Sequence, residues 1–280
     1  MYYNLPPTKN FFTNHKGLKI HYREWLTNSS NFIFYIHGYN CNINRNITDE
    51  FSKLIPHINI CAYDIQGHGF SQGETALVES KNDLIKDGLQ FINLMLKKHK
   101  INKYIIMGSS MGGSLAIELT KEINDKKLIG TILLAPAISL CGNNNQLLEH
   151  LLQNYISYYL PKQKFPNFLN YRVDTSKSIN CPKLIQFTNN DELTYKENIK
   201  FQTVNTIISL GYSNLQNTHK IKSKITILHD INDQITSFNS SAKFCALTKS
   251  KLIPLHNQKH DLLANCPNII KKITLKYFKL

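Results

Sequence analysis

The sequence lacks long apolar segments. No stretch of the 280 residues approaches the ~18 consecutive apolar residues of a membrane-spanning helix. Residues 1–10 contain two prolines and no apolar segment of the kind found in secretory signal peptides. No internal repeat or low-complexity linker divides the chain. These absences predict a soluble protein with one large core.

Paired cysteines are also missing. The six cysteines form neither a Cys-x-x-Cys pair nor the regular spacing of a disulfide framework. Several lie inside apolar runs, where free cysteine behaves as a small hydrophobic residue. This usage favours a reducing, cytoplasmic environment.

Acidic residues are scarce: 19 Asp and Glu face 33 Lys and Arg, for a formal net charge of +14. Such a charge favours a nucleic-acid partner or an anionic membrane surface. The lysines, however, are scattered and form only short pairs, such as Lys97 with Lys98. A nucleic-acid site concentrates its charge on one element, so we predict no nucleic-acid partner. Peripheral contact with an anionic membrane stays open, and the sequence does not predict an oligomeric state.

Compact apolar runs alternate with helical patterns along most of the chain. Most of these runs are apolar on both faces, as buried parallel strands require, and each is followed by a turn signal. The helical stretch 83–98 repeats its apolar residues at spacings of three and four. We predict an α/β fold with a mostly parallel eight-stranded sheet and helices on both faces. The predicted strands are 10–14, 19–25, 32–36, 58–63, 104–107, 129–135, 225–228 and 251–255.

The alternation stops between residues 137 and 219. This gap is too long for one crossover helix, so we predict that 137–219 is a helical cap inserted into a core made of 1–136 and 220–280. Within it, 147–160 carries leucines and tyrosines at helical spacing and ends at Pro161. This apolar face either packs inside the cap or lines a tunnel for an acyl chain.

Residues 108–112 read Gly-Ser-Ser-Met-Gly, directly after an apolar strand and before the helical pattern 114–121. A Gly-x-Ser-x-Gly motif in this context predicts a nucleophile elbow, a strained strand-to-helix turn that presents Ser110 above the sheet. The N–H groups of the following helix, Met111 among them, then face a developing oxyanion.

A serine hydroxyl is a poor nucleophile at neutral pH, so a base must follow later in the chain. His150, His219 and His229 lie in the cap or before the acid candidates, so their position argues against them. His256 is close to the end of the last strand, whereas His260 opens a helical run after a loop. We favour His260.

The acid candidates are Asp230 and Asp233, in the loop after strand 225–228, with Asp191 as a weaker rival inside the cap. Asp233 lies further beyond the strand and leaves room for one helix and one strand before His260. Asp230 suits a turn or a helix cap. We therefore predict that Asp233 orients neutral His260 and stabilises its imidazolium.

The second oxyanion donor is expected in the loop after strand 32–36, and the Tyr39 amide is our candidate. His37 precedes the nucleophile, and no Cys, His or Asp cluster with the spacing of metal ligands surrounds it. We interpret His37 as a residue that fixes the loop, and we predict no metal site.

Together these motifs resemble the monoglyceride lipases and lysophospholipases of the α/β-hydrolase superfamily. The resemblance spans nearly the whole chain. Its most specific part is 64–73, Asp-Ile-Gln-Gly-His-Gly-Phe-Ser-Gln-Gly. The other matching segments are 12–14, 17–20, Trp25, 37–38, 108–113, 135–136, 191–193, 227–233 and 260–263.

The resemblance implies a serine-dependent carboxylic-ester hydrolase that acts on monoacyl lipids through an acyl-enzyme and needs no metal or organic cofactor. It supports the triad of Ser110, Asp233 and His260, with Tyr39 and Met111 at the oxyanion hole, and it assigns Asp191 to the cap. An esterase, thioesterase or amidase acting on other acyl groups stays possible, as does a silent ligand-binding protein.

The chain departs from the family pattern at four positions. Asn40 and Cys41 stand where relatives carry glycine and an acidic residue. Asp230 replaces a usual glycine, and Glu192 replaces a proline in the cap. None of these changes removes a predicted catalytic group.

Overall fold

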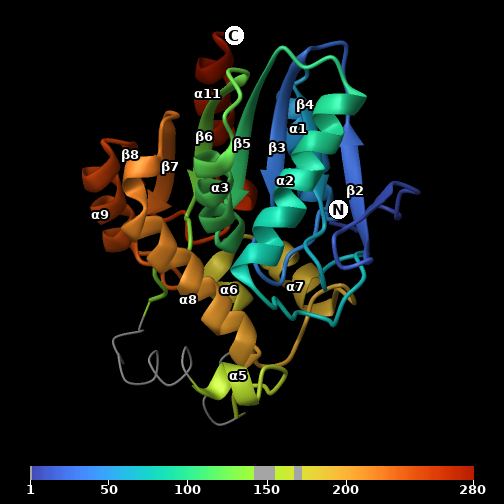
Figure 1. The fold of residues 1–280 in the computed structure, drawn as a ribbon, viewed down its shortest axis with the longest axis vertical. Helices are drawn as coiled ribbons and strands as arrows, with labels where there is room; N and C mark the ends of the chain where they lie inside the picture. The colour runs from blue at the N-terminus through green and yellow to red at the C-terminus, as the bar shows by residue number, and fades with distance from the viewer. Residues whose placement is uncertain (1, 142–154, 167–171) are drawn as a thin grey trace.

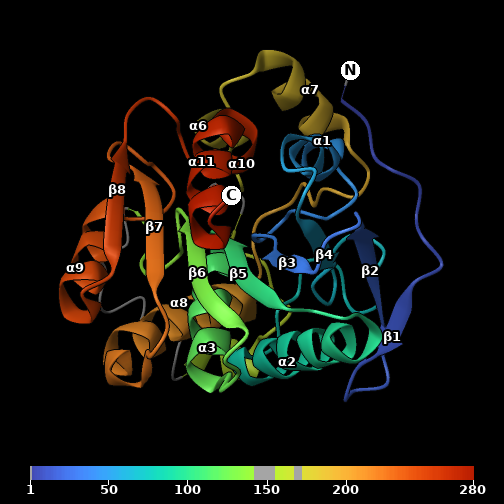
Figure 2. The same cartoon turned by 90° about the horizontal axis from the view of Figure 1, so that it is seen from above.

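The computed structural model describes residues 2–141, 155–166 and 172–280, and an eight-stranded sheet forms its centre (Figures 1 and 2). The strand order is β1-β2-β4-β3-β5-β6-β7-β8. The β1–β2 and β2–β4 pairs are antiparallel, and all later pairs are parallel, which confirms the predicted mostly parallel sheet. The strands are β1 (Phe11–Thr13), β2 (Lys19–Trp25), β3 (Asn31–Ile36), β4 (Asn59–Tyr63), β5 (Lys103–Ser109), β6 (Leu128–Leu134), β7 (Ile225–Asp230) and β8 (Lys251–Leu255).

The central strands are buried on both faces because helices cover the sheet from two sides. In β3, Phe32 and Phe34 belong to one hydrophobic core, whereas Ile33 and Tyr35 belong to the other, as the two-residue period of a strand requires. Figure 2 shows helices on both sides of the sheet. The helices are α1 (Asn46–Leu54), α2 (Lys81–Lys98), α3 (Met111–Glu122), α5 (Ser157–Tyr159), α6 (Thr175–Ser178), α7 (Pro182–Asn190), α8 (Phe201–Gln216), α9 (Phe238–Thr248), α10 (Leu262–Asn265) and α11 (Pro267–Phe278), with a 3₁₀ turn η3 (Thr218–Lys220).

Helix α2 begins two residues before the start that apolar spacing predicts. Its N-cap is Ser80, whose hydroxyl accepts the backbone N–H of Asp83 at 3.1 Å. This bond satisfies one of the free amides of the first turn. The predicted start at 83 missed this first turn because Lys81 and Asn82 carry no apolar signal.

The segment between β6 and β7 contains α5 to α8 and η3. Helix α8 packs along α3 and α2 on one face of the sheet (Figure 1). Helix α8 also approaches the segment that follows β6: an added Cβ on Gly211 would lie 2.2 Å from the Ile138 carbonyl oxygen. The division into a core and a cap over 137–219 stays a prediction.

The predicted amphipathic helix of 147–160 falls largely outside the described residues, which leave out Leu147, Leu148, Leu151 and Leu152. Its described end includes α5, where Tyr158 and Tyr159 are more than 70% exposed. No described helix has the length and the apolar content that crossing a membrane requires.

Candidate active site

Ser110 occupies the turn between β5 and α3. Its φ of 54° and ψ of −121° lie in a region that strains a residue with a side chain. The turn is tight enough that a Cβ on Gly108 would lie 2.3 Å from the Gly112 carbonyl oxygen. A Cβ on Gly112 would lie 2.3 Å from the carbonyl oxygen of His37. Both glycines of the motif are therefore required by backbone contact with neighbouring strands and helix.

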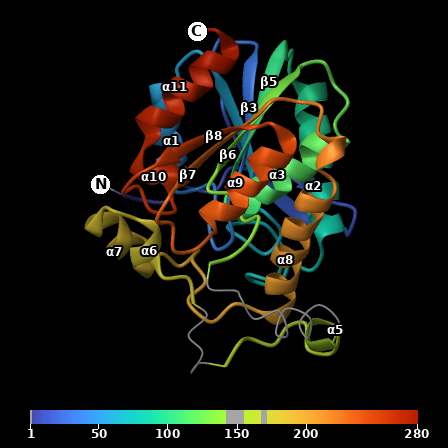
Figure 3. The ribbon, with the colours of Figure 1, turned by 90° about the vertical axis from the view of Figure 1, so that its left-hand side faces the viewer.

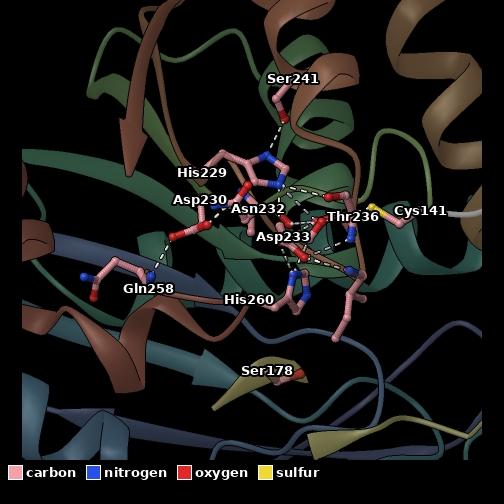
Figure 4. A network of polar contacts seen from close by, with 12 residues as sticks. Cys141, Ser178, His229, Asp230, Asn232, Asp233, Thr236, Ser241, Gln258 and His260 are labelled. Carbon is pink, nitrogen blue, oxygen red and sulfur yellow. Dashed lines mark hydrogen bonds and ion pairs between the residues drawn. The ribbon is translucent and has the colours of Figure 1, made fainter. Parts of the chain in front are cut away.

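Asp233 and His260, from the loops after β7 and β8, form a buried hydrogen bond of 2.7 Å between Oδ2 and Nδ1 (Figure 4). The other carboxylate oxygen accepts the backbone N–H groups of Ile235 at 2.7 Å and Thr236 at 3.2 Å. Because an ionised carboxylate only accepts, the His260 proton sits on Nδ1. The Nε2 atom is then free to accept a proton.

The environment of Asp233 keeps it ionised. Burial by itself raises the pKa of this carboxyl group, but hydrogen bonds from His229 and His260 and from the Ile235 amide outweigh burial. The net effect holds the pKa of Asp233 well below its usual value. A permanently charged Asp233 can stabilise a positive His260.

Ser110 and His260 line one cavity of about 330 Å³, together with Tyr39 and Met111. Within the described part of the chain, no hydrogen bond joins Ser110 to the His260 ring; catalytic contacts often tighten only when substrate is bound. Much of the cavity wall is apolar and comes from Leu140, Phe165, Ile179, Val204, Ile207 and Leu263.

The loop after β3 lies directly over the nucleophile. A Cβ on Gly38 would lie 2.9 Å from the Cβ of Ser110, so only glycine allows this approach. The His37 ring fixes the loop, since its Nε2 accepts the Ile65 backbone N–H at 2.9 Å. Burial lowers the pKa of His37, which keeps the ring neutral. Tyr39 then follows at the cavity wall.

Asn40 holds the same loop to the chain between α7 and α8. Its backbone is left-handed, with φ of 57°, a conformation that asparagine tolerates better than most residues. Its side chain donates to the Tyr195 carbonyl at 2.9 Å and accepts the Tyr195 N–H at 2.7 Å. Sequence reasoning treated Asn40 only as a departure from glycine, because the partner lies 155 residues away.

Asp191, at the end of α7, supports this contact. Its carboxylate accepts from the Asn4 side chain at 2.7 Å and from the Thr194 hydroxyl at 3.1 Å. Arg45, which is buried, donates to the same Thr194 hydroxyl at 3.0 Å. Asp191 therefore orders residues 191–195, and the carboxylate that binds His260 is that of Asp233.

The rivals of the predicted acid and base have other contacts. Asp230 accepts the backbone N–H groups of Asn232 and Gln258 and so joins the loops after β7 and β8 (Figure 4). His256 is exposed. The functional contact that sequence reasoning missed is His229, which it set aside for its place in a strand. Its Nε2 lies 3.2 Å from Asp233 Oδ2.

Among the described residues no cluster of three or more His, Cys, Asp or Glu side chains has the arrangement of a metal site. The described site contains a serine in a strained strand-to-helix turn, a buried Asp–His pair and an adjacent loop with Gly38.

A model of the family described as serine aminopeptidase, S33, matches residues 27–266. The chain belongs to this family of α/β-hydrolases. Family membership and the observed sheet confirm the predicted α/β-hydrolase fold.

Two curated relatives are monoglyceride lipases. The Rattus norvegicus protein is 26% identical over 170 residues, which cover 60% of this chain and 54% of the relative. The Homo sapiens protein is 26% identical over 115 residues, or 40% of this chain and 38% of the relative. The chain thus spans about half the length of the rat relative.

Solved structures show the same fold at lower identity. A soluble variant of Saccharomyces cerevisiae monoglyceride lipase, in complex with a substrate analogue, has a TM-score of 0.82 at 17% identity and covers 97% of this chain and 95% of its own. The Paleococcus ferrophilus monoacylglycerol lipase has a TM-score of 0.78 at 16% identity, over 92% and 99% of the two chains.

Proposed function

We propose that the protein hydrolyses carboxylic esters of monoacyl lipids, as a monoacylglycerol lipase or lysophospholipase, with Ser110 as nucleophile, His260 as base and Asp233 as acid. One observation carries the proposal: the 2.7 Å Asp233–His260 bond sits beside the apolar cavity that Ser110 also lines. Similarity to monoglyceride lipases supports the choice of substrate.

Acylation begins when Ser110 Oγ attacks the ester carbonyl carbon and passes its proton to His260 Nε2. Asp233 stabilises the imidazolium that forms. The negative charge on the former carbonyl oxygen is bound by the backbone N–H groups of Tyr39 and Met111, at the positive end of α3.

The tetrahedral intermediate then collapses. The bond from carbonyl carbon to the alcohol oxygen breaks, and that oxygen takes the proton from His260. The acyl group remains on Ser110 as an ester. Water attacks this ester, loses a proton to His260, and releases a fatty acid while the proton returns to Ser110.

The volume and lining of the cavity favour a single acyl chain. Its volume of about 330 Å³ falls in the usual range for small-molecule sites, which bind their ligands largely through apolar contact. Phe165, Val204 and Ile207 supply such a wall on the side of the cap.

We expect Ser110→Ala to lower kcat for monoacyl esters by about 10⁴-fold or more, because the acyl-enzyme cannot form. A panel of monoacylglycerols and lysophospholipids of graded chain length measures this and identifies the preferred head group. Labelling with a fluorophosphonate gives a second readout. Ser114→Ala is the matched control, since Ser114 lies one helical turn along α3 but is buried and does not line the cavity. Equal ester cleavage by wild type and Ser110→Ala would refute the proposal.

The same triad can serve amide or thioester substrates, and the family description names an aminopeptidase. Kinetics on matched ester, thioester and amide substrates with one acyl group separate these activities. If this protein only binds its ligand and does not turn it over, the fluorophosphonate should leave Ser110 unlabelled.

A further inference from the structure

Asp233 contacts two histidines through a single oxygen atom. Its Oδ2 lies 2.7 Å from His260 Nδ1 and 3.2 Å from His229 Nε2. His229 belongs to β7, four residues before Asp233, so the turn that presents the carboxylate folds back over the ring. Figure 4 shows the carboxylate between the two imidazoles.

The neighbours of His229 fix where its proton lies. Nε2 faces two groups that only accept, Asp233 Oδ2 and the Thr236 carbonyl, each at 3.2 Å. It also lies 3.3 Å from the Thr236 hydroxyl, whose own hydrogen has the Ala135 carbonyl and Asp233 Oδ2 as acceptors. This nitrogen therefore carries the hydrogen. Nδ1 lies 2.8 Å from the Ser241 hydroxyl, which donates to it. A line of hydrogen bonds therefore runs from Ser241 through His229 to Asp233, where it meets the bond from His260.

This line repeats the residue types of a Ser-His-Asp triad, but it is not a second active centre. The Ser241 and His229 side chains are completely buried, and neither lines the cavity that contains Ser110. No substrate reaches Ser241, so any effect of His229 on chemistry acts through Asp233.

We propose that His229 is a positioning residue for the triad: it holds Asp233 Oδ2 toward His260 and shares its negative charge, and it thereby sets the pH range in which His260 accepts the Ser110 proton. The inference rests on the proposed function of Ser110. It assigns a role to a histidine outside the predicted triad.

The other side chains in direct contact with Asp233 and His229 are neutral. Thr236 Oγ1 lies 3.1 Å from Oδ2, the Cys141 thiol donates to the Asp233 backbone carbonyl at 3.2 Å, and the Phe238 ring of α9 contacts His229 with centroids 5.8 Å apart.

Two carboxylates flank this centre, and neither binds His229. Asp230 is occupied by the backbone amides of Asn232 and Gln258. Asp261 caps α10 by accepting the Ala264 N–H. These charges are the same in wild type and in any His229 variant, so they do not account for a difference between them.

The sign of the expected effect follows from charge sharing. A donor to Oδ2 withdraws part of its negative charge, so less charge is available to stabilise the His260 imidazolium. Removal of the His229 donor leaves a more basic carboxylate, and His260 then holds its proton to higher pH. Since protonated His260 cannot act as a base, the acidic limb of the kcat/KM profile moves to higher pH.

The test compares wild type with His229→Leu and His229→Gln. We expect kcat/KM of His229→Leu to fall about tenfold near the acidic limb, with that limb displaced to higher pH, and a smaller fall on the alkaline plateau. Glutamine retains an N–H donor, so His229→Gln should restore most of the wild-type profile. His21→Leu removes another buried His–Asp bond, of 2.8 Å to Asp64, and controls for lost stability without displacing the limb.

NMR of ¹⁵N-histidine-labelled protein provides a readout that needs no substrate. In wild type, His229 should carry hydrogen on Nε2 and none on Nδ1. The midpoint of the His260 titration should be higher in His229→Leu than in wild type or His229→Gln. The opposite His229 tautomer, or one midpoint in all three proteins, would overturn the inference. Failure of fluorophosphonate labelling and ester cleavage would instead overturn the proposed function and leave this readout intact.

Discussion

The buried histidines of this protein have different roles because their neighbours differ. His68, in the segment 64–73, lies buried against the rings of His37 and Tyr39. Its Nδ1 donates to the Gln66 carbonyl at 3.1 Å, and among the described residues its Nε2 has no partner. Burial, together with the nearby His37, lowers the pKa of His68 to about 4 from 6.5.

His68 should make stability depend on pH between these two values. The folded state keeps the ring neutral, whereas the unfolded chain takes up a proton below about pH 6.5. Protonation of His68 therefore does not affect the free energy of unfolding above pH 6.5. As the pH falls from 6.5 toward 4, the free energy of unfolding decreases by about 3 kcal/mol in total. We expect His68→Phe to flatten the curve of unfolding free energy against pH, measured in urea from pH 7.5 to 4.5. Parallel curves for the two proteins would show that His68 titrates normally.

At the scale of single elements, the elbow depends on contacts that leave no space for side chains. An added Cβ at Gly112 meets backbone oxygens of both His37 and Ile36, at 2.3 and 2.4 Å, and backbone cannot move aside as a side chain can. Strand β3 and helix α3 would have to separate. This contact is the reason that the second glycine of the Gly-x-Ser-x-Gly motif is required.

We expect Gly112→Ala to lower the unfolding free energy by about 3 kcal/mol or more and to abolish turnover, since Ser110 is displaced with the turn. The matched control is Gly17→Asn. Gly17 also has a positive φ, of 78°, but an added Cβ meets nothing within 4 Å, so a loss of about 1 kcal/mol or less follows. Denaturant unfolding of both variants measures the difference, and equal losses would contradict the contact argument.

A second element-scale contact joins the loop after β3 to residues 191–195. Asn40→Gly preserves the left-handed backbone and deletes both bonds to Tyr195. We expect kcat for a monoacyl ester to fall about tenfold, because the loop that carries the Tyr39 amide loses two hydrogen bonds that order it. Asn217→Gly, at the end of α8, makes the same replacement away from the site. If both variants turned over substrate at the wild-type rate, the contact would have no part in positioning the loop.

At the scale of the whole molecule, both the formal net charge of +14 and the position of α5 favour contact with an anionic membrane. Helix α5 lies at the end of the molecule opposite the C-terminus (Figures 1 and 3). Its exposed Tyr158 and Tyr159 are close in sequence to Lys162 and Lys164, which pair with Glu74 and Glu197. Tyrosine beside lysine suits the interface of an anionic bilayer.

We expect the protein to bind vesicles that contain phosphatidylserine more tightly than vesicles of phosphatidylcholine alone, and to lose this preference in about 0.5 M salt. The double variant Tyr158→Ser, Tyr159→Ser should weaken binding to the anionic vesicles without altering hydrolysis of a short-chain ester. Co-sedimentation measures binding. If the affinity for vesicles changes neither with lipid charge nor with salt, the basic composition has no role at membranes.

The sequence determined the features that depend on local pattern. Apolar runs with turn signals predicted the mostly parallel sheet, and Gly-x-Ser-x-Gly after a strand predicted the strained turn that holds Ser110, because both depend on residues adjacent in the chain. The choice of Asp233 and His260 also came from order and loop position, and the structure joins these two by one bond of 2.7 Å. Element ends were less determined, as Ser80 at the start of α2 shows, since caps depend on single polar residues.

Only the tertiary structure decided the contacts between residues far apart in the chain. Asn40 reaches Tyr195 across 155 positions, and His229 reaches His260 through Asp233 although each alone is an ordinary strand or loop histidine. No local pattern encodes these pairs, because a hydrogen bond depends on distance in space and the fold alone brings the partners together. The local sequence thus specifies the candidate catalytic groups, and the packing of distant segments specifies the environment that sets their charge and position.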